Sequence, residues 1–191
     1  MTNDTQRPLI LASGSPRRRE LLAKMGYTFE TCSPDVDEHV EGLARDIVMT
    51  LARRKALAAA ERYDRGVIIA SDTLVSLDGA PLGKPEDAAD AHRMLRALSG
   101  REHEVFTGVC LIDAQTGRLQ VREVRTGVTF RALTDAEIDA YIATGEPMDK
   151  AGAYAIQGGA APFVAALDGE FENVVGFPVI EVKSMLAEFG M

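Results

Sequence analysis

The stretch LILASGSPRRRELLAKMG, residues 9–26, sets the fold class because it joins a strand directly to a helix. Consecutive apolar residues at 9–12 predict a buried strand, and the apolar spacing over 16–25 predicts an amphipathic helix. Ser15 is the expected N-cap, a proline takes the first helical position, and Gly26 follows the helix end. A strand that leads at once into a helix is typical of an α/β protein.

Three arginines crowd the start of this helix: Arg17, Arg18 and Arg19 directly follow SGSP. The first turn of a helix carries partial positive charge, so basic residues are disfavoured there. Glycine permits close approach of the backbone, and the hydroxyl, backbone N–H and guanidinium groups are all donors. Together they would form an anion cradle suited to phosphate. On the residues alone, an ordinary Ser-Pro helix start with solvated arginines remains an open alternative.

The rest of the chain alternates strands with helices, and hairpins interrupt that alternation. Strands are expected within 27–32 and at 67–70, and two or three more within 103–133. Turns are expected at Asp78–Gly79, near 115–117 and at Gly127. Helices are expected at 43–63, 85–98, 134–145 and from 178 to about 189. The Gly-rich segment 151–178 is expected to be β-like, with a turn at 168–169. The pattern predicts one α/β domain over 1–191 with a mixed sheet.

The composition indicates a cytoplasmic protein that is not a general nucleic-acid binder. The chain has 191 residues and a net charge of −8, which disfavours nucleic acid and anionic membranes as partners. No apolar run approaches the ~18 residues of a membrane helix, and the start, MTNDTQRP, lacks the layout of a signal peptide. Cys32 and Cys110 have no partner motif, as is typical of a reducing compartment. Any anionic ligand must therefore be held by a local cationic pocket.

Several acids and lysines are candidates for the remaining chemistry. Asp72 follows the apolar run 67–70, so we expect it near that strand's carboxyl end, where open α/β sheets bind ligands. The segment PDVDE, 34–38, adds carboxylates that could help to hold a divalent cation. Lys55 and Lys84 supply cations. Taken alone, Asp72 is better explained as a plain strand-to-turn aspartate, and the loop acids and Lys55 as solvated surface residues. Together they favour a phosphorylated small molecule with a divalent metal.

Ordered motifs carry a family resemblance. LASGSPRRRELL, PDVDE, ARRKA, SDTLV, GKP, LSG, TGV, TFR and DKAGAYAIQG…NVVGFP occur in the order seen in the Maf family of nucleoside triphosphate pyrophosphatases. The resemblance implies a Maf- or ITPase-like α/β fold, with an elongated mixed β-sheet flanked by helices and two lobes around a central cleft. It also implies hydrolysis of the α–β phosphoanhydride to a nucleoside monophosphate and pyrophosphate, a divalent metal (Mg²⁺ or Mn²⁺), and a homodimer by analogy.

The resemblance assigns roles residue by residue. The family's phosphate-binding motif falls on Ser13, Ser15, Arg17 and Arg18. The catalytic set matches four residues: the proton-accepting aspartate Asp72, the cleft glutamate Glu38, the helix lysine Lys55 and the GKP lysine Lys84. Ser71 stands where the family motif has alanine. Asp72 and Glu38 would hold the metal, and whether Asp72 acts as general base or as metal ligand stays open.

The segment DKAGAYAIQGGA resembles the branch that acts on dTTP and UTP, with modified uridine triphosphates as further candidates. Arg17, Thr73 and Gln157 align with positions thought to set substrate choice. An amide such as Gln157 offers a donor and an acceptor to a pyrimidine edge, although it could also be structural. The implied role is cleansing of nucleotide pools. The alternatives are a 7-methyl-GTP pyrophosphatase and a nucleotide-binding regulator of septum formation that acts through a partner.

Overall fold

The protein is organised around one seven-stranded mixed sheet in the order β2-β1-β3-β5-β6-β7, with β4 paired to β3. The computed structural model describes residues 7–191. Most of the segment MTNDTQRP, in which no signal peptide was expected, therefore lies outside the described residues. The strands are β1 (Leu9–Ala12), β2 (Glu30–Cys32), β3 (Val67–Leu77), β4 (Ala80–Leu82), β5 (Glu102–Asp113), β6 (Leu119–Phe130) and β7 (Val164–Asp168). The expected mixed α/β sheet is confirmed.

Strand directions follow from the connections. β1 runs parallel to β2 and β3, because the links between these strands are long crossovers. β3, β5, β6 and β7 are successively antiparallel, and β3 turns tightly into β4 at Asp78–Gly79. Both turn residues have positive φ, 52° and 81°, as a type I′ hairpin requires. The expected hairpin is therefore confirmed.

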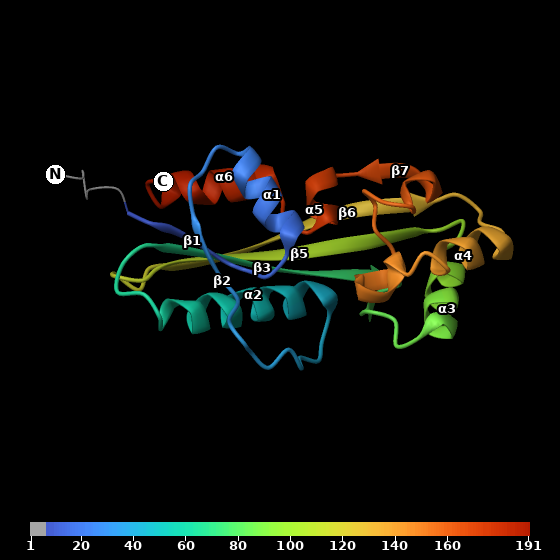
Figure 1. Ribbon diagram of the computed structural model, residues 1–191, viewed down its shortest axis with the longest axis horizontal. Coiled ribbons are helices and arrows are strands. Elements are labelled where there is room, and N and C mark those ends of the chain that lie inside the picture. The colour runs from blue at the N-terminus through green and yellow to red at the C-terminus, as the bar shows by residue number, and fades with distance from the viewer. Residues whose placement is uncertain (1–6) are drawn as a thin grey trace.

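Helices cover both faces of the sheet (Figure 1). They are α1 (Pro16–Lys24), α2 (Ala44–Ala60), α3 (Ala88–Leu98), α4 (Asp135–Ile142), α5 (Phe171–Val175) and α6 (Val179–Glu188). Figure 1 shows α2 along one face and α1 and α6 on the other, while α3 and α4 gather at one end of the elongated sheet. The larger core joins buried side chains of α1, α3, α4 and α6 with the sheet. No helix within residues 7–191 is long and apolar enough to cross a membrane.

One sequence expectation about Asp72 was wrong. The residue does not end a strand at 67–70, because β3 continues as an 11-residue strand from Val67 to Leu77. Asp72 lies in its middle, paired with Gly108 of β5. The polar residues of SDT resemble the end of a strand, but they remain part of β3 because each pairs with a residue of β5 in an unbroken ladder. The carboxylate therefore projects from the middle of the sheet, not from its edge.

The C-terminal third also differs from expectation. Residues 146–163 contain three 3₁₀ turns, η1 (Glu146–Asp149), η2 (Ala151–Ala153) and η3 (Ala161–Phe163), and the last two lie within 151–178, where a β-like segment was expected. Prolines in η1 and η3 and a left-handed glycine in η2 disfavour an extended ladder. The short helix α5 was not anticipated, and Gly127 lies within β6, not at a turn.

Helix α2 lies unusually close to the sheet. A smaller core on this side contains the alanines Ala52, Ala56 and Ala59, whose short side chains permit the approach. A Cβ atom placed on Gly108 would lie 2.3 Å from the carbonyl oxygen of Val48. This contact leaves no room for a side chain, and it fixes the height of α2 above β3 and β5.

We expect Gly108→Ala to lower the free energy of unfolding by about 1–3 kcal/mol, because the added methyl group overpacks the contact between α2 and β5. Denaturant unfolding measures the change. Gly83→Ala is the matched control, since a Cβ there meets no atom within 4 Å. Equal stabilities of the two variants would contradict this account of the packing.

Candidate active site

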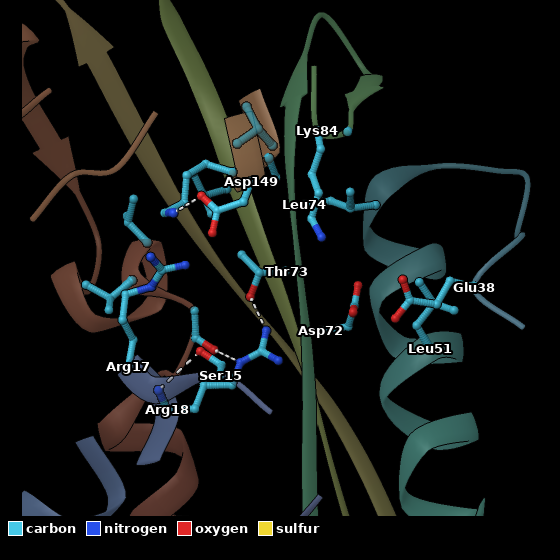
Figure 2. Close-up of a pocket in the computed structure, with 18 of the residues that line it drawn as sticks. Ser15, Arg17, Arg18, Glu38, Leu51, Asp72, Thr73, Leu74, Lys84 and Asp149 are labelled. Atoms are coloured by element: carbon cyan, nitrogen blue, oxygen red, sulfur yellow. Dashed lines mark hydrogen bonds and ion pairs between the residues drawn. The ribbon is translucent and has the colours of Figure 1, made fainter. Parts of the chain in front are cut away.

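A cavity of about 920 Å³ opens between α1 and α2. Figure 2 shows β3 between the two walls, with Ser15 and Arg17 on the side of α1 and Glu38 and Leu51 on the side of α2. Eight of the residues proposed from the sequence line it: Ser15, Arg17, Arg18, Glu38, Lys55, Asp72, Thr73 and Lys84. These residues are separated by long stretches of chain, so the fold itself brings them together.

The turn before α1 is organised by serine hydroxyls. Ser15 Oγ accepts the backbone N–H of Arg18 at 3.5 Å and caps the helix, as expected. Ser13 Oγ accepts the backbone N–H of Ser15 at 3.2 Å. Ser13 is buried and is not among the residues that line the cavity, so its hydroxyl supports the turn. A hydroxyl that accepts through oxygen can still donate its proton, so Ser15, which lines the cavity, keeps a donor for an anion.

Arg17 and Arg18 have different surroundings. The Arg18 guanidinium donates to Gly176 O at 2.9 Å, to Thr73 Oγ1 at 3.2 Å and to Ser13 Oγ at 3.4 Å. Burial lowers the pKa of Arg18, and the charge of Asp72 opposes that shift. Arg18 therefore ties α1 to β3 and to the end of α5.

Arg17 is the arginine with donor capacity to spare. Its Nε is buried and has no hydrogen-bond partner in the described part of the chain. A buried, unpaired donor is costly, and an anionic ligand would satisfy it. Arg19, the third arginine of the run, is exposed and does not line the cavity.

Lys55 joins the two candidate carboxylates. Its Nζ lies 2.6 Å from Asp72 Oδ1 and 2.7 Å from Glu38 Oε1. The side chains of Lys55 and Asp72 are largely buried, at 15% and 14% exposure, whereas that of Glu38 is 62% exposed. The hydrogen bond from Lys55 holds the pKa of Glu38 below its usual range, and the charges of Lys55 and Lys84 contribute further. The result is an alternating acid–base–acid group beside the anion cradle.

The loop that carries Glu38 is anchored by α2. Arg54 Nη1 donates to the carbonyl oxygens of Asp37 and His39, at 2.9 and 3.3 Å, on either side of Glu38. Lys84, just beyond β4, points into the same space (Figure 2). The acids at the end of the PDVDE segment therefore diverge: Glu38 faces the cavity, while Asp37 caps its own turn by accepting the N–H of His39 at 2.9 Å.

A buried polar network supports Thr73. Its Oγ1 lies 2.9 Å from Thr107 Oγ1, which donates to Asn173 O at 3.1 Å. Asn173 is fully buried, and its amide donates to Val105 O and to Thr126 Oγ1, both at 3.1 Å. The network locks α5 against β5 and β6. The sequence signal for it was the NVVGFP motif, to which no role had been assigned.

A second cavity of about 220 Å³ adjoins the first and holds the remaining candidate, Gln157. Arg17, Lys150 and Tyr154 line both cavities, so the two lie side by side. Lys150 forms an ion pair with Asp149, and the hydrogen bond from Lys150 lowers the pKa of Asp149. Asp149, Lys150 and Tyr154 were missed as site residues, although the DKAGAY motif that contains them was noted.

Tyr154 is supported from behind by His103. The His103 Nε2 and Tyr154 Oη atoms are 2.9 Å apart, and both rings make edge contacts with Phe130. His103 is 2% exposed, and burial lowers its pKa from 6.5 to about 4. The imidazole is therefore neutral in the folded protein at neutral pH, whereas in the unfolded chain it binds a proton below pH 6.5.

We expect this histidine to make stability fall as the pH is lowered. The unfolded chain binds the proton more readily than the folded protein. The contribution of His103 to the free energy of unfolding is therefore fully present above pH 6.5, and it falls by up to about 3 kcal/mol as the pH is lowered to 4. Urea unfolding of the wild type and of His103→Gln at each pH isolates this component, since other titrations are shared. A difference between the two proteins that stays constant from pH 7 to pH 4 would contradict the assignment.

The fold and the charge layout define an α/β protein with a cleft suited to a polyphosphate ligand. Residues 8–189 match the family model described as Maf-like protein, and the chain belongs to this family. Relatives named dTTP/UTP pyrophosphatase include that of Geobacter sulfurreducens, 50% identical over 184 residues, which are 95% of this chain and 96% of the relative. That of Moorella thermoacetica is 48% identical over 187 residues, or 96% and 95%.

Proposed function

We propose that this protein hydrolyses dTTP and UTP to the nucleoside monophosphate and pyrophosphate. The observation that carries the proposal is one cavity in which Arg17, whose buried Nε has no hydrogen-bond partner among the described residues, lies across from Lys55, Asp72 and Glu38. An anion site next to paired carboxylates is what cleavage of a phosphoanhydride requires. The names of relatives about 50% identical to this chain support the same activity.

The triphosphate would bind across the start of α1. The Ser15 hydroxyl and Arg17 would donate to the phosphate oxygens, and Lys84 would add charge from the opposite side. The negative charge of the ligand then compensates the arginines at the helix start. Because Arg18 already bonds to Gly176 and Thr73, its main contribution is to hold this wall of the cavity in place.

The donor set fits a hard divalent cation such as Mg²⁺ or Mn²⁺. Asp72 and Glu38 both offer carboxylate oxygens and contact the same ammonium group. Within residues 7–191, no three His, Cys, Asp or Glu side chains are grouped so as to hold a metal. Two carboxylates with phosphate oxygens and water are a usual environment for Mg²⁺. Asp72 and Glu38 would hold the cation, which when bound would neutralise charge on the phosphates.

In the reaction, the oxygen of a water molecule attacks the α-phosphorus, and the bond from that phosphorus to the α–β bridging oxygen breaks. Pyrophosphate is the leaving group. In this proposal Asp72 orients the water and accepts its proton, while Lys55 orients Asp72 through its hydrogen bond. Lys55, Lys84 and Arg17 offset charge that develops on the transferred group and on the leaving oxygen. Gln157, which lines the second cavity, would contact the base in this proposal.

The deciding experiment measures pyrophosphate release from dTTP, UTP, CTP, ATP, GTP and 7-methyl-GTP with Mg²⁺, with Mn²⁺ and with EDTA. We expect dTTP and UTP to be hydrolysed in a metal-dependent manner. Preference for 7-methyl-GTP would assign the protein to the other branch. Nucleotide binding without any turnover would favour the regulatory alternative.

We expect Asp72→Asn to lower kcat by about 10²–10⁴-fold while changing nucleotide affinity by less than about 3-fold, because the amide keeps the shape of the carboxylate but accepts no proton. The assay is steady-state pyrophosphate release beside equilibrium titration of dTTP. Asp78→Asn, in the exposed turn just after β3, is the matched control and should keep full activity. Loss of binding with intact turnover would show that Asp72 has another role.

We also propose that the protein acts in the cytoplasm, where nucleoside triphosphates are consumed. Both cysteines, Cys32 and Cys110, are free thiols, which suits a reducing compartment. The homodimer expected by analogy and the expected lack of a nucleic-acid partner stay predictions.

A further inference from the structure

The loop 155–159, which carries Gln157, is fastened on both sides of that residue. The backbone N–H of Ala155 donates to Tyr141 Oη at 2.9 Å, and the backbone N–H of Gly159 donates to Glu146 Oε2 at 2.9 Å. Tyr141 belongs to α4, and Glu146 begins η1 just beyond it. Gln157 itself is exposed at the second cavity, so its position depends on how these flanking bonds hold the backbone.

Tyr141 and Glu146 act as one unit. Tyr141 is 4% exposed, and its ring makes an edge contact with Phe163 at 5.4 Å between centroids. Burial raises the pKa of Tyr141, and a hydrogen bond with the Glu146 carboxylate raises it further. The buried phenol thus holds the carboxylate, and both groups hold the loop. We call this pair, Tyr141 with Glu146, the loop clamp.

The glycines of the loop are fitted to the clamp. A Cβ atom on Gly158 would lie 2.0 Å from Glu146 Oε1 and 2.5 Å from its Cδ. A Cβ atom on Gly159 would lie 2.9 Å from the ring of Tyr141. Neither glycine has a left-handed φ, so close approach, and not backbone conformation, is what requires glycine at these positions.

We propose that the loop clamp positions Gln157, so that Glu146 determines which nucleobase is accepted without taking part in the hydrolysis. The inference rests on the proposed function, because it concerns base choice at the same site. Glu146 lines the second cavity without lining the first, whereas the groups proposed to bind phosphate, Ser15, Arg17 and Lys84, line the first cavity from the start of α1 and from just beyond β4. Loss of the clamp should therefore weaken base discrimination and leave recognition of the phosphates unchanged.

The test compares Glu146→Ala with Glu146→Gln, using kcat and KM for dTTP and GTP. Tripolyphosphate serves as a competitive inhibitor without a base. Alanine removes the acceptor for Gly159 N–H, and we expect the dTTP-to-GTP ratio of kcat/KM to fall about 10-fold through KM, as for one lost hydrogen bond. Both kcat for dTTP and the tripolyphosphate inhibition constant should stay within about 2-fold. Glutamine keeps an acceptor oxygen and should restore most of the discrimination.

Gly158→Ala provides an independent arm. In the wild type its methyl group would displace the Glu146 carboxylate, so it should reproduce the loss of discrimination seen in Glu146→Ala. In the Glu146→Ala background the obstructing carboxylate is gone, and the same change should add less than about 2-fold. This non-additivity is the signature of direct contact between the two positions.

Glu137→Ala is the matched control for simple destabilisation. Glu137 forms the capping box of α4 with Thr134 and bonds to Arg131, but it does not contact the loop. This variant should lose stability and keep the dTTP-to-GTP ratio. If Glu137→Ala and Glu146→Ala changed the ratio equally, or if tripolyphosphate inhibition weakened in step with dTTP affinity, the clamp would be merely structural and the inference overturned.

Failure of the proposed function can be told apart from failure of the clamp. Equilibrium binding of the α,β-imido analogues of dTTP and GTP measures discrimination without turnover. Suppose that the wild type shows no hydrolysis, yet binds the dTTP analogue more tightly than the GTP analogue. Glu146→Ala must then still reduce that preference. An unchanged preference in Glu146→Ala overturns the inference, and so does a wild type that binds both analogues equally.

Discussion

The close packing of α2 against the sheet at Gly108 is the constraint on which the site depends. Asp72 pairs with Gly108 across the β3–β5 ladder, so the point of closest approach lies beside the candidate catalytic carboxylate. At this height the Lys55 ammonium can reach Asp72 and Glu38 together. A helix one side-chain layer further out would leave both acids without that cation. The packing of α2 and the arrangement of the candidate site therefore depend on the same contact, which requires small side chains on α2 and β5.

The charges of the site are divided between internal bonds and free donors. Arg18 is satisfied by Gly176, Thr73 and Ser13, whereas Arg17, its neighbour in sequence, has a buried donor with no partner among residues 7–191. Adjacent residues of one type thus serve opposite purposes because α1 turns one toward β3 and the other toward the cavities. The positive charge at the start of α1 is preorganised for a ligand and does not need to be assembled when the ligand binds.

Local signals predicted the fold well where they act within one segment. The Ser15 cap and the Asp78–Gly79 turn each depend on neighbours in sequence, and both occur as expected. The place of Asp72 was missed because the pairing partner that extends β3 is far away in the chain. The loop clamp could not be predicted either, since Glu146 meets its loop only through tertiary structure and its spacing from Gln157 resembles no motif.

The lengths of the strands also bear on how the molecule behaves in a crowded solution. The long strands β3 and β5 lie inside the sheet, while the outermost strands, β2 and β7, have only 3 and 5 residues. β6 extends beyond its pairing with β7, and this stretch carries charged side chains such as Arg122 and Arg125. Short or charged edges offer little template for adding a foreign strand. The sheet is thus protected from edge-to-edge aggregation.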